Sequence, residues 1–325
     1  MTTSLAFQIT LLTQLGRTGS LIVILMIVLA GCYQTAPTAS GPVATPTRVA
    51  KPRPPHTVVL DGSAIVGEIM QGVGLGFEGF TPGYTVQVGK VGTLDGFKML
   101  CEDSTDIQMA VRVMSAEEAS TCLRNGIDYL QITVGYDVLA VIGKNPLGEC
   151  VSSSELTYLY GNANLTWHNV RGGLPFDPVT IFAPPPTTAA AQFFAERVLA
   201  NKPTAATPPD VQQLITGGGD GIGYLPLAVA QKLGGRLPIL AVDSGAGCTA
   251  PAAESVWDGS YSFLSRPLYL YINRQSVHRS EVFRFLSYAL SIPGQTYIGA
   301  VGYVVASPKT YQDAQAELDL IVQQG

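Results

Sequence analysis

Charged residues are scarce in this chain. Asp, Glu, Lys and Arg make up 13% of its 325 residues, which is about half the share found in ordinary globular proteins. The 19 basic residues are outnumbered by 24 acidic ones, which gives a formal net charge of −5. Proteins that bind nucleic acids neutralise phosphates with an excess of Lys and Arg. We therefore expect this chain not to bind DNA or RNA.

Soft metal ligands are also few, since the chain has three His and five Cys. This composition argues against a dedicated zinc or haem protein, and we expect neither a metal nor a cofactor. A hydrolase triad would have to use His168 or His278, and no Gly-x-Ser-x-Gly motif is present to partner them. The sequence thus predicts that the protein is not an enzyme.

Apolar residues, in contrast, are abundant at 46%, enough to form a sizeable core. The longest apolar run, residues 21–30, is too short to cross a bilayer comfortably and is typical of a signal-peptide core. It ends in Leu29-Ala30-Gly31-Cys32, which resembles a bacterial lipobox. We predict that residues 1–31 are removed and that Cys32 carries a lipid. The alternatives are a chance Cys after an ordinary signal peptide and a short signal-anchor helix.

A stretch rich in Thr, Ala and Pro follows Cys32. Such composition stays extended and forms no core. Residues 32–56 are therefore predicted to be a tether, with His56 solvated, and the folded body is predicted to start near Thr57. Together, these features place the body outside the cytoplasm, anchored to the membrane through lipid.

The remaining cysteines are Cys101, Cys122, Cys150 and Cys248. Outside the cytosol, an even number suggests two disulfides. Three pairings are possible. We favour Cys101–Cys122 because its loop is short, which leaves Cys150–Cys248.

Strand-like and helix-like runs alternate along the body, which predicts an α/β fold with helices on both faces of the sheet. Residues 64–71 are expected to form a helix. Residues 129–133 and 137–142 are expected to form two separate strands. The GxGxxG pattern at residues 74–79 lacks the strand and helix of a dinucleotide site, and we interpret it as a loop.

Several short motifs occur in the order and spacing of a known family. The chain resembles the phosphate-binding lipoproteins of phosphate ABC importers, which have the type II periplasmic-binding-protein fold. The motifs that carry the resemblance are Asp61-Gly62-Ser63, Gly92-Thr93-Leu94-Asp95-Gly96-Phe97, Thr105-Asp106-Ile107, Gly221-Ile222-Gly223-Tyr224, Leu264-Ser265-Arg266-Pro267-Leu268-Tyr269 and Val301-Gly302-Tyr303.

The resemblance implies two lobes that are joined by a two-strand hinge and close over a ligand. Residues 57–135 and 255–325 would form lobe 1, and residues 136–254 would form lobe 2. The implied partners are phosphate or another small oxyanion and the permease of an ABC importer, and we expect a monomer.

Helix N-termini suit an oxyanion because their N–H groups are unpaired and carry partial positive charge. The resemblance places ligand contacts at Ser63, Ala64, Thr93, Asp106, Arg112, Thr187 and Thr188. Among these, Asp106 would accept the proton of a protonated oxyanion, which sulfate lacks. The alternative is a structural Asp106, for example one paired with Arg112. Ser63 can cap a helix and bind an anion at the same time, whereas for Thr187 and Thr188 we favour helix capping over ligand contact.

Departures from the family pattern weaken the prediction of a phosphate site. Val91, Val111 and Ala190 stand where the family has hydroxyl side chains, and three prolines before Thr187 remove N–H donors. A hydrogen bond to a charged group contributes about 1.5–3 kcal/mol. Losing two or three would cost roughly 3–9 kcal/mol of binding free energy. The second hypothesis is therefore a relative that acts as a sensor or surface protein without a tight phosphate site.

Overall fold

The structure is a computed structural model that describes residues 52–324. The predicted signal peptide, the lipidation site Cys32 and the tether up to residue 51 lie outside these residues. The folded body falls within one compact unit, Arg48–Gly325. Across the part of the chain that is described, no helix has the length and apolar character needed to cross a membrane.

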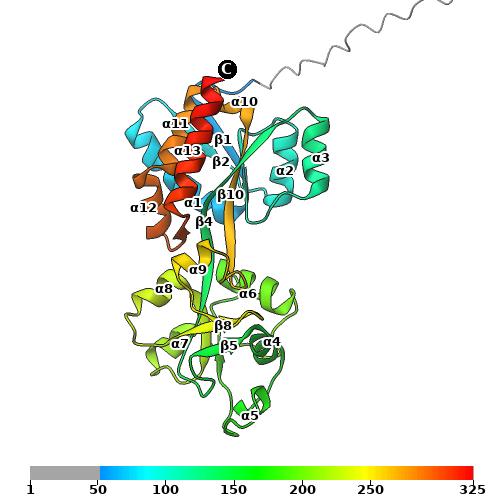
Figure 1. Ribbon diagram of the computed structural model, residues 1–325, viewed down its shortest axis with the longest axis vertical. Coiled ribbons are helices and arrows are strands. Elements are labelled where there is room, and N and C mark those ends of the chain that lie inside the picture. Colours follow the sequence, from blue (N-terminus) through cyan, green and yellow to red (C-terminus); the bar gives the residue numbers. More distant parts are fainter. Residues whose placement is uncertain (1–51, 325) are drawn as a thin grey trace, which may run out of the picture. The chain divides into compact units, whose positions relative to one another are not determined.

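Strands and helices alternate along the body, which confirms the predicted α/β class (Figure 1). The first part contains β1 (Thr57–Gly62), α1 (Ala64–Phe80), β2 (Thr85–Val88), α2 (Thr93–Cys101), β3 (Ile107–Ala110), α3 (Ala116–Arg124) and β4 (Tyr129–Ile142). The middle part contains β5 (Cys150–Ser152), α4 (Ser153–Gly161), α5 (Trp167–Val170), β6 (Ile181–Phe182), α6 (Ala189–Leu199), α7 (Val211–Thr216), β7 (Ile222–Pro226), α8 (Leu227–Lys232), β8 (Ile239–Asp243), β9 (Cys248–Thr249) and α9 (Ala253–Trp257). The last part contains β10 (Ser265–Asn273), α10 (Arg274–Val277), α11 (Ser280–Leu290), α12 (Ile292–Ala300), β11 (Val304–Val305) and α13 (Pro308–Gln323).

The main path of the sheet runs in the order β2-β1-β3-β10-β4-β7-β6. Strand β1 pairs in parallel with both β2 and β3. The carboxyl ends of these three strands therefore lie at the same end of the sheet. Helices α1 and α2 begin at this carboxyl edge. Strand β10 is antiparallel to β3 and to β4.

Two large hydrophobic clusters form the interior. The first core is built by β1, α1, β3, α11 and α13 with the early part of β4, up to Val134. The second core is built by the later part of β4, from Val138, with the elements from β5 to α9. The core changes along β4 between these two residues, both of which are buried.

Strands β4 and β10 are two long segments that run from one core to the other. They pair continuously from Ser265↔Val138 to Asn273↔Tyr129, with one register shift at Leu268/Tyr269 (Figure 1). The two separate strands predicted at residues 129–133 and 137–142 are thus a single strand. Gly135 interrupts the apolar pattern there, but the ladder with β10 continues through it.

The chain passes back from the second core to the first after residue 254, the boundary that the sequence predicted for lobe 2. Val256, Tyr261 and Leu264 all pack in the second core, and Leu268 is in the first. Residues 255–264, which the sequence assigned to lobe 1, therefore pack with the residues assigned to lobe 2.

The GxGxxG stretch at residues 74–79 is helical, and our interpretation of it as a loop was wrong. Helix α1 runs through it to Phe80. A Cβ on Gly74 would lie 3.0 Å from Val86 side-chain atoms, and one on Gly76 would lie 2.5 Å from the Tyr288 hydroxyl. Glycine disfavours helix locally, but here it lets α1 approach its neighbours closely.

The structure contains the two disulfides favoured from the sequence. Cys101–Cys122 joins α2 to α3, and Cys150–Cys248 joins β5 to β9. The predicted pairing is confirmed.

Candidate functional site

Two helices begin side by side at the carboxyl edge of β1 and β3. The N–H group of Gly92 donates to the carbonyl of Gly62 at 2.8 Å, and the N–H group of Ser63 donates to the carbonyl of Met109 at 2.8 Å. These bonds bring together Gly62, Ser63 and Ala64 at the start of α1 with Gly92 and Thr93 at the start of α2. We call these five residues the helix-start cluster.

Neither helix start in the helix-start cluster has a side-chain cap, a feature that it shares with α8, α11 and α12. Ser63 makes no capping hydrogen bond, and Gly92 has no side chain to make one. By contrast, hydroxyl caps are present on α3, α4, α6 and α13, from Ser115, Ser152, Thr188 and Ser307. First-turn amides without a cap retain hydrogen-bonding capacity and the partial positive charge of the helix end. The two adjacent helix starts can therefore donate to an anion.

Asp61 is an acidic residue next to this cluster, and our sequence analysis included it in a family motif without giving it a role in the site. Its Oδ1 accepts from the N–H of Gly62 at 2.8 Å and from the N–H of Val91 at 3.0 Å. The carboxylate thus ties the loop before α2 to the end of β1. Its position immediately before Gly62-Ser63 in the sequence could have indicated that it lies beside the helix-start cluster.

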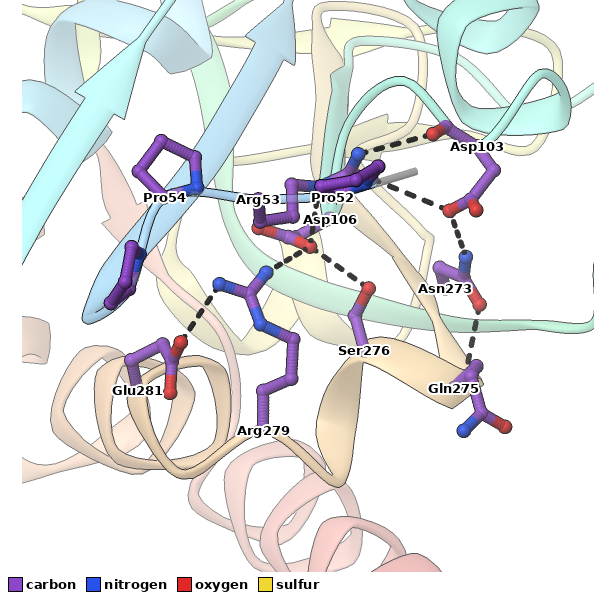
Figure 2. Close-up of a pocket in the computed structure, with 11 residues that line it drawn as sticks. Pro52, Arg53, Pro54, Asp103, Asp106, Asn273, Gln275, Ser276, Arg279 and Glu281 are labelled. Atoms are coloured by element: carbon purple, nitrogen blue, oxygen red, sulfur yellow. Dashed lines mark hydrogen bonds and ion pairs between the residues drawn. The ribbon is translucent and has the colours of Figure 1, made fainter. Parts of the chain in front are cut away.

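Asp106 lies away from the cluster, at the amino end of β3. Its side chain is fully buried. Oδ1 accepts from Arg53 Nε at 3.1 Å, Ser276 Oγ at 2.9 Å and Arg279 Nη1 at 2.7 Å. Oδ2 accepts from the Val59 N–H at 2.9 Å. Figure 2 shows Arg53 and Arg279 both turned toward this carboxylate. The geometry gives Asp106 a structural role, with arginine partners other than the Arg112 that we considered.

The pocket around Asp106 is built partly by residues that the sequence assigned to the tether. It has a volume of about 360 Å³, and Pro52, Arg53, Pro54 and Pro55 line it (Figure 2). Arg53 Nη1 also donates to the Asp103 carbonyl at 3.1 Å. His56 packs edge-on against Tyr84 with ring centroids 5.3 Å apart. Residues 52–56 therefore make contacts with the folded body, and His56 is exposed, as predicted, with one ring contact.

Arg112 follows β3, and its guanidinium is engaged by an acidic partner. It donates to both oxygens of Glu118, at 2.8 and 2.7 Å, and lies over the Phe97 ring at 5.1 Å. The hydrogen bond from Arg112 is the main cause that lowers the pKa of Glu118 to about 2. The predicted ligand contact of Arg112 would require this bidentate pair to open.

Thr187 and Thr188 lie at the start of α6, beside the second core. The Thr188 hydroxyl accepts from the Ala191 N–H at 3.3 Å and donates to the Pro185 carbonyl at 2.8 Å. Thr188 is thus a helix cap, and Thr187 is exposed. The structure brings Ser63, Ala64 and Thr93 together, and it sets the other predicted contacts in separate surroundings.

A buried ion pair joins the two strands that connect the cores. Arg266 on β10 donates through Nε and Nη2 to Asp137 Oδ2 on β4, at 3.0 and 2.8 Å. The Arg266 guanidinium also lies 4.2 Å from the centre of the Phe193 ring on α6. Burial raises the pKa of Asp137, and Arg266 opposes that shift. The pair therefore links β4 and β10 to α6, the helix that Thr188 caps.

No group of three or more His, Cys, Asp or Glu side chains within residues 52–324 is arranged to hold a metal ion. The N–H groups of Gly62, Ser63 and Gly92 already donate within the protein. The donors that the helix-start cluster offers are therefore the N–H groups of Ala64 and Thr93 and the hydroxyls of Ser63 and Thr93. Such a set binds anions rather than metal cations.

Comparison with known proteins identifies relatives over most of the chain. Residues 36–292 match the model of the PBP superfamily domain. Protein SphX of Synechococcus elongatus is 29% identical over 270 residues, covering 79% of this chain and 80% of that protein. The phosphate-binding protein PstS of Staphylococcus haemolyticus is 27% identical over 266 residues, covering 79% of this chain and 84% of that protein.

Solved structures show the same fold. A possible phosphate binding protein from Planctomyces limnophilus is 27% identical with a TM-score of 0.74, covering 82% of this chain and 98% of that one. An ABC-type phosphate transport receptor from Vibrio cholerae, at 17% identity, has a TM-score of 0.61 over 77% of this chain and 99% of that one. The predicted type II periplasmic-binding-protein fold is confirmed, and the family is one of non-enzymatic binding proteins. From its match to the family model and its fold, the chain belongs to the PBP superfamily.

Proposed function

We propose that this chain is the extracytoplasmic substrate-binding lipoprotein of an ABC importer, and that it binds phosphate or a related small oxyanion. The observation that carries the proposal is the helix-start cluster, where two helices without side-chain caps begin at one edge. The PstS and SphX relatives and the phosphate-binding structural neighbours support phosphate as the anion.

In this proposal the first core carries the primary anion site. The uncapped amides of α1 and α2 donate to the oxyanion, and the hydroxyls of Ser63 and Thr93 supplement them. Strands β4 and β10, which run from one core to the other, act as the hinge between the lobes. The start of α6 approaches the ligand when the lobes close. A ligand that contacts both lobes favours the closed form. The protein then delivers the anion to the permease.

The second candidate is a relative that has lost tight phosphate binding. Three observations favour it: Arg112 is paired with Glu118, the Thr188 hydroxyl caps α6, and Ala190 lacks a hydroxyl. Each removes a donor that the family resemblance implied.

The two candidates are separated by thermal melting of the full-length chain in detergent, monitored by the fluorescence of Trp167 and Trp257. Phosphate, arsenate, sulfate and molybdate are titrated into protein freed of phosphate. A ligand that binds only the folded state at 100 times its Kd stabilises by about 2.7 kcal/mol. We expect a saturable rise in Tm with phosphate, and a smaller rise in the Ser63→Ala/Thr93→Val double variant.

Asp106→Asn is the matched control, because Asp106 lies outside the proposed site. It should lower the starting Tm and keep the rise with phosphate. Cooperative melting of the wild-type chain without a rise in Tm for any oxyanion would reject the phosphate proposal and favour the second candidate.

A further inference from the structure

Gln108 is a fully buried polar residue that lies behind the helix-start cluster. It is on β3, in register with Asp61 on β1. Its Nε2 donates to the carbonyl of Thr93 at 2.9 Å. Because Thr93 is the first residue of α2, this bond fastens the start of the helix to the central sheet.

The other end of the same amide contacts two glycines. A Cβ on Gly62 would lie 1.9 Å from Gln108 Oε1, and one on Gly96 would lie 2.6 Å from it. The amide oxygen is therefore packed against the backbone of β1 at one glycine and of α2 at the other. Any larger side chain at either position would displace it.

Gln108 Oε1 has no hydrogen-bond partner, and among the described residues it is the one buried side-chain N or O atom in this state. Flipping the amide would not help, since Oε1 would then face the Thr93 carbonyl, and two acceptors repel. An unpartnered buried acceptor destabilises a fold. Methionine would have similar length without this cost. Stability alone therefore does not explain a glutamine at this position.

We propose that Gln108 is a positioning residue of the anion site, an inference that rests on the proposed function. Its amide fixes the start of α2 against β3 while its oxygen abuts Gly62 at the start of α1. The uncapped amides of both helices are thereby held at a common point. Gln108 does not touch the ligand, because the backbone of Gly62 and Gly96 covers it.

Removing the Gln108–Thr93 bond should weaken binding without changing the charge of the site. For Gln108→Met we expect about a tenfold higher Kd for phosphate, which corresponds to the loss of about one hydrogen bond's contribution. Gln108→Glu should weaken binding further, since a carboxylate cannot donate to the Thr93 carbonyl and adds negative charge behind the anion.

The test combines two measurements on the full-length chain. The first is the exchange rate of the Gly92 and Gly96 amide protons without phosphate, since both amides form hydrogen bonds at the start of α2. The second is the Kd for inorganic phosphate by calorimetry. Thr105→Val is the matched control, because Thr105 is also fully buried and its hydroxyl donates to the Val59 carbonyl at 2.8 Å, just before the same strand.

Faster exchange and a higher Kd in Gln108→Met, with both values within twofold of wild type in Thr105→Val, would support the positioning role. Unchanged exchange in Gln108→Met, or a Kd within twofold of wild type, would overturn it. So would equal loss of affinity in both variants, since this would be a general effect of lower stability. If wild-type protein binds no phosphate, the proposed function fails, and the exchange rates still decide whether Gln108 holds the helix starts.

Discussion

A Cβ atom on Gly96 would lie 2.7 Å from the Cα atom of Gly62. Helix α2 and the end of β1 are therefore in backbone contact, and no side chain fits between them. This contact sets the distance between the two helix starts.

Gly96→Ala should consequently move α2 away from β1. We expect a loss of about 1–3 kcal/mol in unfolding free energy from overpacking, together with weaker phosphate binding. Denaturant titration and calorimetry measure the two effects. Gly79→Ala in α1 is the control, since a Cβ there meets nothing within 4 Å, and it should stabilise by about 0.5–1 kcal/mol. Equal stability of the two variants would contradict the proposed backbone contact.

Arg53 ties the segment before β1 to the body. Its side chain is 11% exposed and pairs with Asp106 and Asp103. Arg53→Ala should lower the unfolding free energy by about 1.5–3 kcal/mol, the usual contribution of hydrogen bonds to charged groups. Lys309→Ala removes an exposed ion pair with Asp313 and should cost no more than about 0.5 kcal/mol. If both variants melt alike, residues 52–56 are not fastened to the body.

The Arg112–Glu118 pair makes stability depend on pH. The pKa of Glu118 is lowered from 4.5 to about 2, chiefly by its hydrogen bond to Arg112. Because the folded state holds this carboxylate ionised, the stabilisation is present above pH 4.5 and is lost as the pH falls through 2. The Tm difference between wild type and Glu118→Gln should thus be largest above pH 5 and shrink toward pH 2. A difference that stays constant over this range would argue against the pair.

The Cys150–Cys248 disulfide closes the longer of the two loops, with a sequence separation of 98 residues against 21 for Cys101–Cys122. Loop-closure entropy predicts about 4.7 kcal/mol for a loop of about this longer length. The Cys150→Ala/Cys248→Ala double variant should therefore unfold at markedly lower denaturant than wild type under oxidising conditions. Adding reductant to the variant then reports the contribution of Cys101–Cys122 alone. A midpoint equal to that of the wild type would refute the expected contribution.

Local patterns predicted much of this protein. Alternating apolar periods gave the α/β class, and the number and spacing of the cysteines favoured the pairs that form. The order of Asp61-Gly62-Ser63, Gly92-Thr93 and the later motifs was enough for the fold family. These sequence patterns predict structure correctly because each depends on residues that are neighbours in the chain or on a small number of possible cysteine pairings.

The helical state of residues 74–79 and the continuity of β4 were not predictable in the same way. Glycines at 74 and 76 oppose a helix locally, and their close contacts with Val86 and Tyr288 exist only once α1 is packed. Likewise, Gly135 interrupts the apolar pattern of β4, and the ladder with β10 carries the strand through it.

The sequence by itself determined that a helix start near Ser63 follows a strand of an α/β body, whereas the start of α2 at Thr93 is a finding of the structure. Only the tertiary structure decided which polar side chains contact the starts of α1 and α2. Asp106 matched a family motif, but Arg53 and Arg279, both far away in the chain, surround it at the amino end of β3. Gln108, two residues later, reaches the helix starts because β1 and β3 pair in a register that turns its side chain between them. A shift of one residue would turn that side chain to the opposite face, and the sequence of the strand alone does not specify this register.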